Sequence, residues 1–427
     1  MNARELALDL LLKAESSKQY SNIALDNALK RSELSSADKS LASAIFYGVI
    51  ERRLTLDYQI NALSSRKIDD IDTKTLNALR IGLYQLIYLD RIPHHAAINE
   101  SVSLCSKKSS GFVNAILRSF LRKGGITLPD KKDTLKYLSI LYSIDTPLLS
   151  KLLSIYGQEE TERFLGAINR STPTTLRVNT LLTDRATLLD KIPSSIPTPN
   201  ASNGILVQGA VRELYGFDDG LFFVQDEASQ ICIEALDAKP NEVIMDVCAC
   251  PGSKSFGAAL SMKNKGEIHS FDLHENKLSL VINSAKRLKI DIIKTSPCDS
   301  RKFLPEFEGK ADRIICDVPC SGFGVIAKKP ELRYKDPKES EMLPKIQSDI
   351  LENVCRYLKS GGTLIYSTCT VLPEENEENI NAFLSRHPDF ILESWRVGNI
   401  FAESGMITLL PHIHNTDGFF IAKLKRK

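Results

Sequence analysis

The chain has 427 residues, 43% of them hydrophobic, which is enough for two or three domains with sizeable cores and excludes wholesale disorder. Its 55 basic and 53 acidic residues give a formal net charge of +2, so a nucleic acid would have to be attracted by local patches. The nine cysteines include no CxxC pair, which disfavours a disulfide scaffold or a zinc site and favours free thiols in a reducing compartment.

The N-terminal residues do not have the pattern of a signal peptide, because Glu5 and Asp9 interrupt the apolar positions. The sequence also contains no run of about 18 apolar residues, so it predicts no transmembrane helix. We therefore expect a soluble, cytoplasmic protein.

The first 130 residues predict an all-helical domain. Apolar residues recur at helical spacing in several stretches, and a serine at 35 or 36 is placed to cap one of these helices. Gly124-Gly125 and the polar stretch 129–133 then predict a domain boundary. The apolar stripes are Leu6, Leu10 and Leu11; Leu25, Ala28 and Leu29; Leu41, Ala44, Ile45 and Val49; Leu76, Leu79, Leu83, Leu86 and Ile87; and Phe112, Val113, Ile116 and Leu117.

Residues 131–235 predict a small α+β middle segment. Strands are expected at 175–180 and 205–207, a short helix at 184–192, and a loop at 193–204, where prolines and an asparagine gather.

Residues 236–427 alternate strand and helix patterns, which predicts an α/β Rossmann-like domain with a doubly wound, mostly parallel sheet. Ligands of such sheets bind beyond the carboxyl ends of the strands. The predicted strands are 243–247, 267–271, 291–295, 313–316, 362–366 and 418–424.

The segment 246–255 follows the first of these strands and opens a helix. Gly252 and its small neighbours allow a ligand to approach the backbone, and the free N–H groups of a helix start attract a carboxylate or phosphate. The segment lacks the G-x-G-x-x-G pattern of dinucleotide-binding folds. It also has Ser253 where a P-loop requires glycine.

Two aspartates follow the next two strands. Asp272 is placed to accept hydrogen bonds from both ribose hydroxyls of an adenosine, and Asp299 from its adenine amino group. Each alone is as well explained as a helix cap. In series, beside a site for an amino-acid carboxylate, they favour S-adenosylmethionine over NAD.

Asp317 and Cys320 follow the fourth strand, and Cys369 follows the fifth. A lone cysteine is usually a small buried hydrophobe. Two cysteines at one sheet edge, each beside turn-forming or small residues, point instead to thiol chemistry. The residues by themselves do not rank the two thiols.

At these residues the chain resembles the Sun/RsmB family of ribosomal RNA cytosine-5 methyltransferases. The N-terminal domain is similar to NusB, an RNA-binding antitermination factor, and this combination implies the family members that modify 16S (small-subunit) rRNA. The likeness covers essentially the whole chain. It is carried by the segments 177–179, 225–229, 246–255, 317–324, 367–370, 373–376 and 417–420, and by 97–102 and 111–118 in the helical domain.

The resemblance implies roles for individual residues. It makes Cys369 the nucleophile and Cys320 the helper that assists product release, with Asp317 beside them. Cys250 and Val318 stand where the family usually has alanine, and Cys250 adds a thiol that we expect to be sensitive to oxidation. The implied cofactor-binding residues are Cys248, Ala249, Cys250, Pro251, Gly252, Ser253, Lys254, Asp272, Asp299 and Asp317.

The implied reaction explains why such groups are needed. Carbon 5 of cytosine is a poor nucleophile until a thiolate adds to carbon 6. An acidic group near N3 must then absorb negative charge, and Asp317 is suited to this if its environment keeps it protonated. A base must finally remove the carbon 5 proton, and the target base must leave its stack to react.

Three alternatives remain open: a tRNA cytosine-5 methyltransferase, a non-catalytic RNA-binding factor, and a small-molecule methyltransferase. The partner we expect is 16S rRNA, bound by a monomer without an obligate protein partner or a membrane. Basic residues of the first two domains, with Lys328, Lys329 and Arg333, are expected to contact phosphates. His94, His95, His412 and His414 lack other close ligands, so no metal site is expected.

Overall fold

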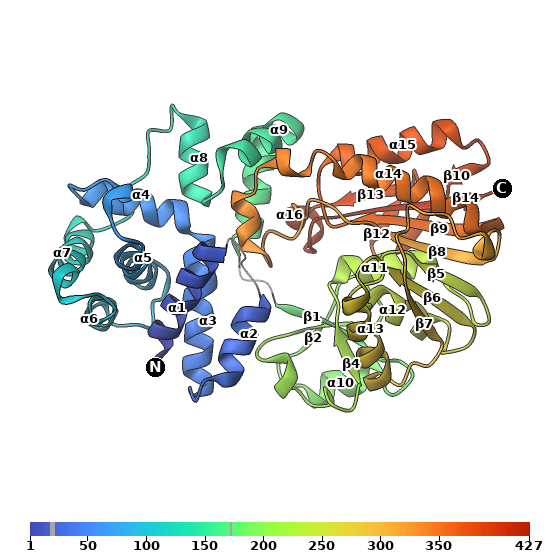
Figure 1. Cartoon of the computed structure of the whole chain (residues 1–427), viewed down its shortest axis with the longest axis horizontal. Helices are drawn as coiled ribbons and strands as arrows, with labels where there is room; N and C mark the ends of the chain where they lie inside the picture. The colour runs from blue at the N-terminus through green and yellow to red at the C-terminus, as the bar shows by residue number, and fades with distance from the viewer. Residues whose placement is uncertain (18–21, 171–172) are drawn as a thin grey trace. The chain divides into compact units, whose positions relative to one another are not determined.

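The computed structural model describes residues 1–17, 22–170 and 173–427 (Figure 1). Its internal contacts divide the chain into two compact units. The first is Met1–Gly166 with Lys328–Pro337, and the second is Ala167–Ala327 with Lys338–Lys427. The sequence predicts three domains, 1–130, 131–235 and 236–427. We keep this division as a proposal, separate from the two compact units.

The first unit is helical, as predicted. Leu6, Leu79 and Leu83 are buried in its core, and Ser35 caps α3 by accepting a hydrogen bond from the Asp38 N–H. The sequence patterns did not predict the long helix α9, which bends at Gly157. The helices are α1 (Ala3–Ser17), α2 (Asn22–Arg31), α3 (Ser36–Glu51), α4 (Arg53–Leu63), α5 (Thr73–Tyr88), α6 (His94–Ser103), α7 (Lys107–Lys123), α8 (Thr134–Tyr142) and α9 (Thr146–Ile168).

Across the described ranges, no single helix is long and apolar enough to cross a membrane. The pair α8 and α9, bent by 111°, meets the length and hydropathy test when taken together.

The segment Lys328–Pro337 packs within the helical unit and corrects one expectation. Arg333 is fully buried, and its guanidinium donates to the Tyr142 carbonyl oxygen at 3.0 Å. The Tyr334 hydroxyl donates to the Ile50 carbonyl oxygen at 2.6 Å. The prediction that Arg333 contacts RNA phosphates is therefore wrong, because its charged end lies inside the unit.

The second unit contains a small antiparallel sheet in the order β2-β3-β1-β4. The expected loop at 193–204 contains the short strand β2, because Ile196 and Pro197 pair with Leu206 and Ile205. Asp184 caps α10 by accepting a hydrogen bond from the Thr187 N–H at 2.8 Å. The elements are β1 (Thr174–Val178), α10 (Arg185–Lys191), β2 (Ile196–Pro197), β3 (Gly204–Val207), β4 (Phe222–Val224) and α11 (Glu227–Leu236).

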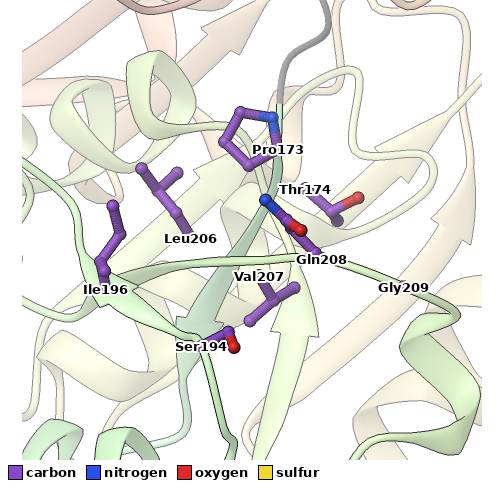
Figure 2. A pocket seen from close by; sticks show the side chains of 8 residues that line it. All are labelled: Pro173, Thr174, Ser194, Ile196, Leu206, Val207, Gln208 and Gly209. Atoms are coloured by element: carbon purple, nitrogen blue, oxygen red, sulfur yellow. The ribbon is translucent and has the colours of Figure 1, made fainter.

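A hollow of about 440 Å³ lies on this small sheet (Figure 2). Residues of β2 and β3 and the start of β1 line it, together with Ser194, Gln208 and Gly209. Its lining contains none of the residues that the sequence analysis assigned to the cofactor or to catalysis.

The large sheet has the order β10-β14-β9-β8-β5-β6-β7, with β13 paired to β14. The strands β5 to β9 run parallel, whereas β10, β13 and β14 are antiparallel additions, so the predicted mostly parallel sheet is confirmed. The strands are β5 (Val243–Asp246), β6 (Glu267–Asp272), β7 (Ile293–Pro297), β8 (Ala311–Asp317), β9 (Leu358–Thr368), β10 (Phe390–Leu392), β13 (Met406–Leu409) and β14 (Phe419–Arg426).

The helices of the second unit that connect these strands are α12 (Ser253–Ser261), α13 (Glu275–Arg287), α14 (Leu343–Val354), α15 (Glu377–Arg386) and α16 (Pro411–His414) (Figure 1). A two-stranded ribbon is formed by β11 (Trp395–Val397) and β12 (Ile400–Ala402). The central strands carry fully buried apolar runs such as Ile314-Ile315 and Leu364-Ile365, which is the pattern of a sheet covered on both faces.

Candidate active site

The loop between β5 and α12 holds the first predicted cofactor residues. The Ala249 N–H donates to the Phe271 carbonyl oxygen at 2.8 Å, which holds the loop against the end of β6. Gly252 has a φ of 107°, and an added Cβ would lie 2.5 Å from the Phe256 ring. A side chain there would be strained and crowded, so the turn into α12 needs glycine. Cys248, Pro251 and Ser253 complete this loop and the helix start.

Asp246 is the last residue of β5 and directly precedes this loop. It is 1% exposed, and one of its oxygens accepts a hydrogen bond from the Ser255 hydroxyl at 2.6 Å. Burial raises the pKa of the Asp246 carboxyl to about 7. Its other oxygen has no hydrogen-bond partner among the described residues.

Asp272 is the last residue of β6, and it hydrogen-bonds to the loop between β5 and α12. Its carboxylate accepts hydrogen bonds from the Cys250 N–H at 3.2 Å and from the His274 N–H at 2.9 Å. Each oxygen keeps a lone pair for a ribose hydroxyl. Burial and the charge of Asp272 raise the pKa of the Cys250 thiol to about 12, which argues against the expected sensitivity of Cys250 to oxidation.

Asp299 lies just beyond β7, at the same edge of the sheet. Its two oxygens accept hydrogen bonds from the Arg301 guanidinium at 2.9 and 2.8 Å, and these bonds lower the pKa of Asp299. A contact between Asp299 and an adenine amino group must therefore share this carboxylate with Arg301.

Lys254, in the first turn of α12, and Asp317, the last residue of β8, form a largely buried ion pair. The Lys254 ammonium lies 2.7 Å from one oxygen of Asp317, and the Ser367 hydroxyl donates to the other at 2.7 Å. Burial lowers the pKa of Lys254, but the charge of Asp317 outweighs this and raises it above the usual value. The pair therefore keeps Lys254 protonated and holds its ammonium at the end of β8.

The two predicted cysteines lie together. The sulfur atoms of Cys320 and Cys369 are 3.2 Å apart, and either thiol can donate the hydrogen bond. The Cys369 N–H lies 3.3 Å from the Cys320 sulfur. The hydrogen bond to Cys369, together with burial, raises the pKa of the Cys320 thiol well above its usual value. Both residues are half-buried.

Several polar residues around these cysteines had no role predicted from the sequence. Ser367 contacts Asp317, and the buried side chains of Gln347 and Glu375 hydrogen-bond to each other at 2.8 Å. The available signal was Glu375 itself, a charged residue within a family-like segment that follows the Cys369 strand. In the parts of the chain that the structure describes, no group of three His, Cys, Asp or Glu side chains is arranged to hold a metal ion.

Known proteins resemble this chain along its whole length. The family model described as 16S rRNA methyltransferase RsmB/F matches residues 233–425, and that of the NusB family matches residues 1–122. The chain is 37% identical over 445 residues to "Probable ribosomal RNA small subunit methyltransferase B" of Bacillus subtilis, covering 100% of this chain and 99% of that protein.

The chain belongs to the RsmB/F family of 16S rRNA methyltransferases.

Further similarities extend along this RsmB/F chain. "Ribosomal RNA small subunit methyltransferase B" of Yersinia pseudotuberculosis is 31% identical over 413 residues, which cover 92% of each protein. The crystal structure of PH0851 superimposes with a TM-score of 0.82 at 27% identity, covering 100% of this chain and 99% of that one.

Membership of the RsmB/F family makes this chain a methyltransferase, and its cofactor is S-adenosylmethionine, as expected from the motifs. The residues present fit that molecule. Gly252, as the N-cap of α12, supplies no side chain to cap its first N–H groups, which suit a carboxylate, and Asp272 retains acceptor capacity for a ribose. The NusB-like N-terminal domain is confirmed as well.

Proposed function

We propose that this chain transfers a methyl group from S-adenosylmethionine to carbon 5 of a cytosine in 16S rRNA, through a covalent bond between Cys369 and carbon 6 of the base. The observation that carries the proposal is the 3.2 Å separation of the Cys320 and Cys369 sulfur atoms. Both cysteines follow the carboxyl ends of β8 and β9, at the same end of the sheet as the loop after β5. A nucleophile and a second thiol therefore adjoin the cofactor site.

In the first stage Cys369 acts as the nucleophile. Its thiolate adds to carbon 6, and the displaced ring electrons make carbon 5 electron-rich. Bound S-adenosylmethionine supplies the electrophilic methyl group that carbon 5 takes. The sequence suggested Asp317 as the acid near N3, but both of its oxygens already accept hydrogen bonds, from Lys254 and Ser367. We therefore assign Asp317 to holding Lys254, whose ammonium stabilises the negative charge that develops on the ring.

In the second stage Cys320 assists release. Its sulfur takes the proton from carbon 5 while it passes its own proton to the sulfur of Cys369. The C5–H electron pair forms the C5–C6 double bond, and the C6–S electron pair returns to Cys369, which leaves as a thiol. This relay needs Cys320 to carry a proton beforehand, and its raised pKa supports that state. The choice of Cys369 as the nucleophile rests on the family likeness.

The test uses the full chain, tritiated S-adenosylmethionine and naked small-subunit rRNA. We expect methyl transfer by the wild type, none by Cys369→Ala, and a denaturant-resistant protein–RNA adduct in Cys320→Ala. An adduct in Cys369→Ala with an inactive Cys320→Ala would reverse the roles of the two thiols. RNA binding by the wild type without methyl transfer would favour a non-catalytic factor, and transfer to tRNA alone would change the substrate.

We also propose that the chain works as a monomer in the cytoplasm. The RNA substrate supports this location, and sedimentation of the full chain with and without the rRNA fragment tests the oligomeric state.

A further inference from the structure

Buried polar side chains hold the peptide groups on both sides of Cys320. On one side the Gln347 side-chain amide donates to the Pro319 carbonyl oxygen at 3.0 Å. On the other side the Ser321 N–H donates to a carboxylate oxygen of Glu375 at 3.0 Å. Gln347 also donates to that same oxygen, at 2.8 Å, which joins the two supports. Gln347 and Glu375 are 0% and 1% exposed, so water does not compete for these bonds.

A second link joins the residues that directly follow the two cysteines. The hydroxyls of Ser321 and Thr370 are 2.7 Å apart and buried. The Gly324 N–H donates to the Cys369 carbonyl oxygen at 2.9 Å, so the two cysteine segments are also tied through their backbones. Together these bonds set how closely the two thiols approach.

The support for Cys320 is anchored on the strand that leads to Cys369. The Tyr366 hydroxyl, near the end of β9, donates to the Glu375 carbonyl oxygen at 2.7 Å. The Asn376 side chain donates to the Thr370 carbonyl oxygen at 3.1 Å. Glu375 thus contacts the Cys320 segment through its side chain, and it contacts β9, the strand that leads to Cys369, through its backbone.

We propose that Glu375, together with Gln347 and the Ser321–Thr370 hydroxyl pair, positions the Cys320 thiol against Cys369 for release of the methylated base. These are positioning residues that act through the cysteine segments. The inference rests on the proposed function, because it assigns them to the second, proton-relaying stage. Attack by Cys369 needs only its own thiol in position, whereas release needs both thiols correctly placed relative to each other. Misplacement by 1 Å can slow a step roughly 100-fold.

The test measures two quantities in single-turnover reactions with tritiated S-adenosylmethionine and naked small-subunit rRNA. One is the rate of methyl transfer, and the other is the decay of the denaturant-resistant adduct. Thr370→Val removes the hydroxyl that pairs with Ser321, and Glu375→Leu removes the carboxylate that accepts from Ser321 and Gln347. We expect each to slow adduct decay at least tenfold while methyl transfer changes less than threefold. Thr370→Ser keeps the hydroxyl and Glu375→Gln keeps an acceptor oxygen. The adducts of these two variants should therefore decay at nearly the wild-type rate.

Thr198→Val is the matched control, because it removes a buried hydroxyl that donates to the Ala201 carbonyl oxygen, in the small sheet. It should leave adduct decay unchanged. If Thr370→Val and Glu375→Leu slow methyl transfer and adduct decay in the same proportion, their role is only structural and the inference is overturned. If Cys320→Ala accumulates an adduct and these two variants do not, the inference fails while the proposed function stands. If Cys320→Ala forms no adduct, both fail.

Discussion

The ammonium of Lys254 lies 2.7 Å from the carboxylate of Asp317, although 63 positions separate the two residues in the sequence. Lys254 belongs to the helix that follows the cofactor loop, and Asp317 ends the strand that leads to Cys320. Their ion pair therefore ties the part of the site that holds the cofactor to the part that performs the chemistry. The Lys254 side chain is 10% exposed and that of Asp317 is 29% exposed.

Replacing Lys254 by methionine should destabilise the second unit, because it leaves the Asp317 charge partly buried without its partner. Breaking a buried pair in this way costs about 3 to 5 kcal/mol, and the partial exposure of Asp317 places this case at the lower end. Urea unfolding of wild type and variant without ligands measures the change. Lys345→Met is the control, because its pair with Asp349 is exposed and is worth about 0 to 1 kcal/mol. Equal losses in the two variants would contradict this account.

The raised pKa of Asp246 predicts a specific dependence of stability on pH. Burial raises it to about 7 in the folded chain, against about 3.9 in an unfolded one. Between these values the folded state binds a proton that the unfolded state lacks. This contribution is therefore complete below about pH 4 and is lost as the pH rises to 7, by up to about 1.4 kcal/mol per pH unit.

Comparison of the wild type with Asp246→Asn isolates this effect, because asparagine does not titrate. Unfolding free energies measured from pH 4 to pH 8 without cofactor should show the wild type losing stability relative to the variant as the pH rises. A constant difference across this range would mean that Asp246 keeps an ordinary pKa in the folded chain.

Gly324 is the glycine whose replacement should most directly disturb the cysteines. An added Cβ would lie 1.9 Å from the Gly418 carbonyl oxygen and 2.9 Å from that of Cys369. These are backbone atoms, so Gly324→Ala must move the Cys320 segment away from Gly418 and from Cys369. We expect loss of methyl transfer by about 100-fold or more, together with lower stability.

Gly111→Ala is the matched control for this substitution. Gly111 lies within α7, and an added Cβ would meet no atom within 4 Å. Alanine there should stabilise the helix by up to about 1 kcal/mol and leave methyl transfer unchanged. If Gly324→Ala retains wild-type activity, the close approach of these backbones is not needed for the reaction.

The sequence could predict the features that depend on local patterns. Alternating strand and helix periods placed β5 to β9 and β14, because each of these strands carries its own apolar run between turn residues. Turn chemistry around Gly252 and the positions of Asp317, Cys320 and Cys369 after successive strands placed the candidate site at one edge of the sheet. Parallel strands with helical crossovers bring such positions together whatever the details of packing.

Features that depend on partners far away in the sequence could not be predicted. The strands β2 and β10 to β13 have two to four residues each, so pairing with other strands defines them more than their own composition does. Arg333 is a residue type that often contacts phosphates, and only its packing against α3 and the end of α8 buries its charge.

The same division applies within the site. The sequence by itself determined which residue types reach the carboxyl ends of the strands, because strand periodicity and turn geometry are local. Only the tertiary structure decided that Lys254 pairs with Asp317, that Arg301 pairs with Asp299, and that Glu375 accepts a hydrogen bond from the Cys320 segment. A hydrogen bond or ion pair depends on distances of about 3 Å between side chains, and packing sets those distances between elements that are remote along the chain.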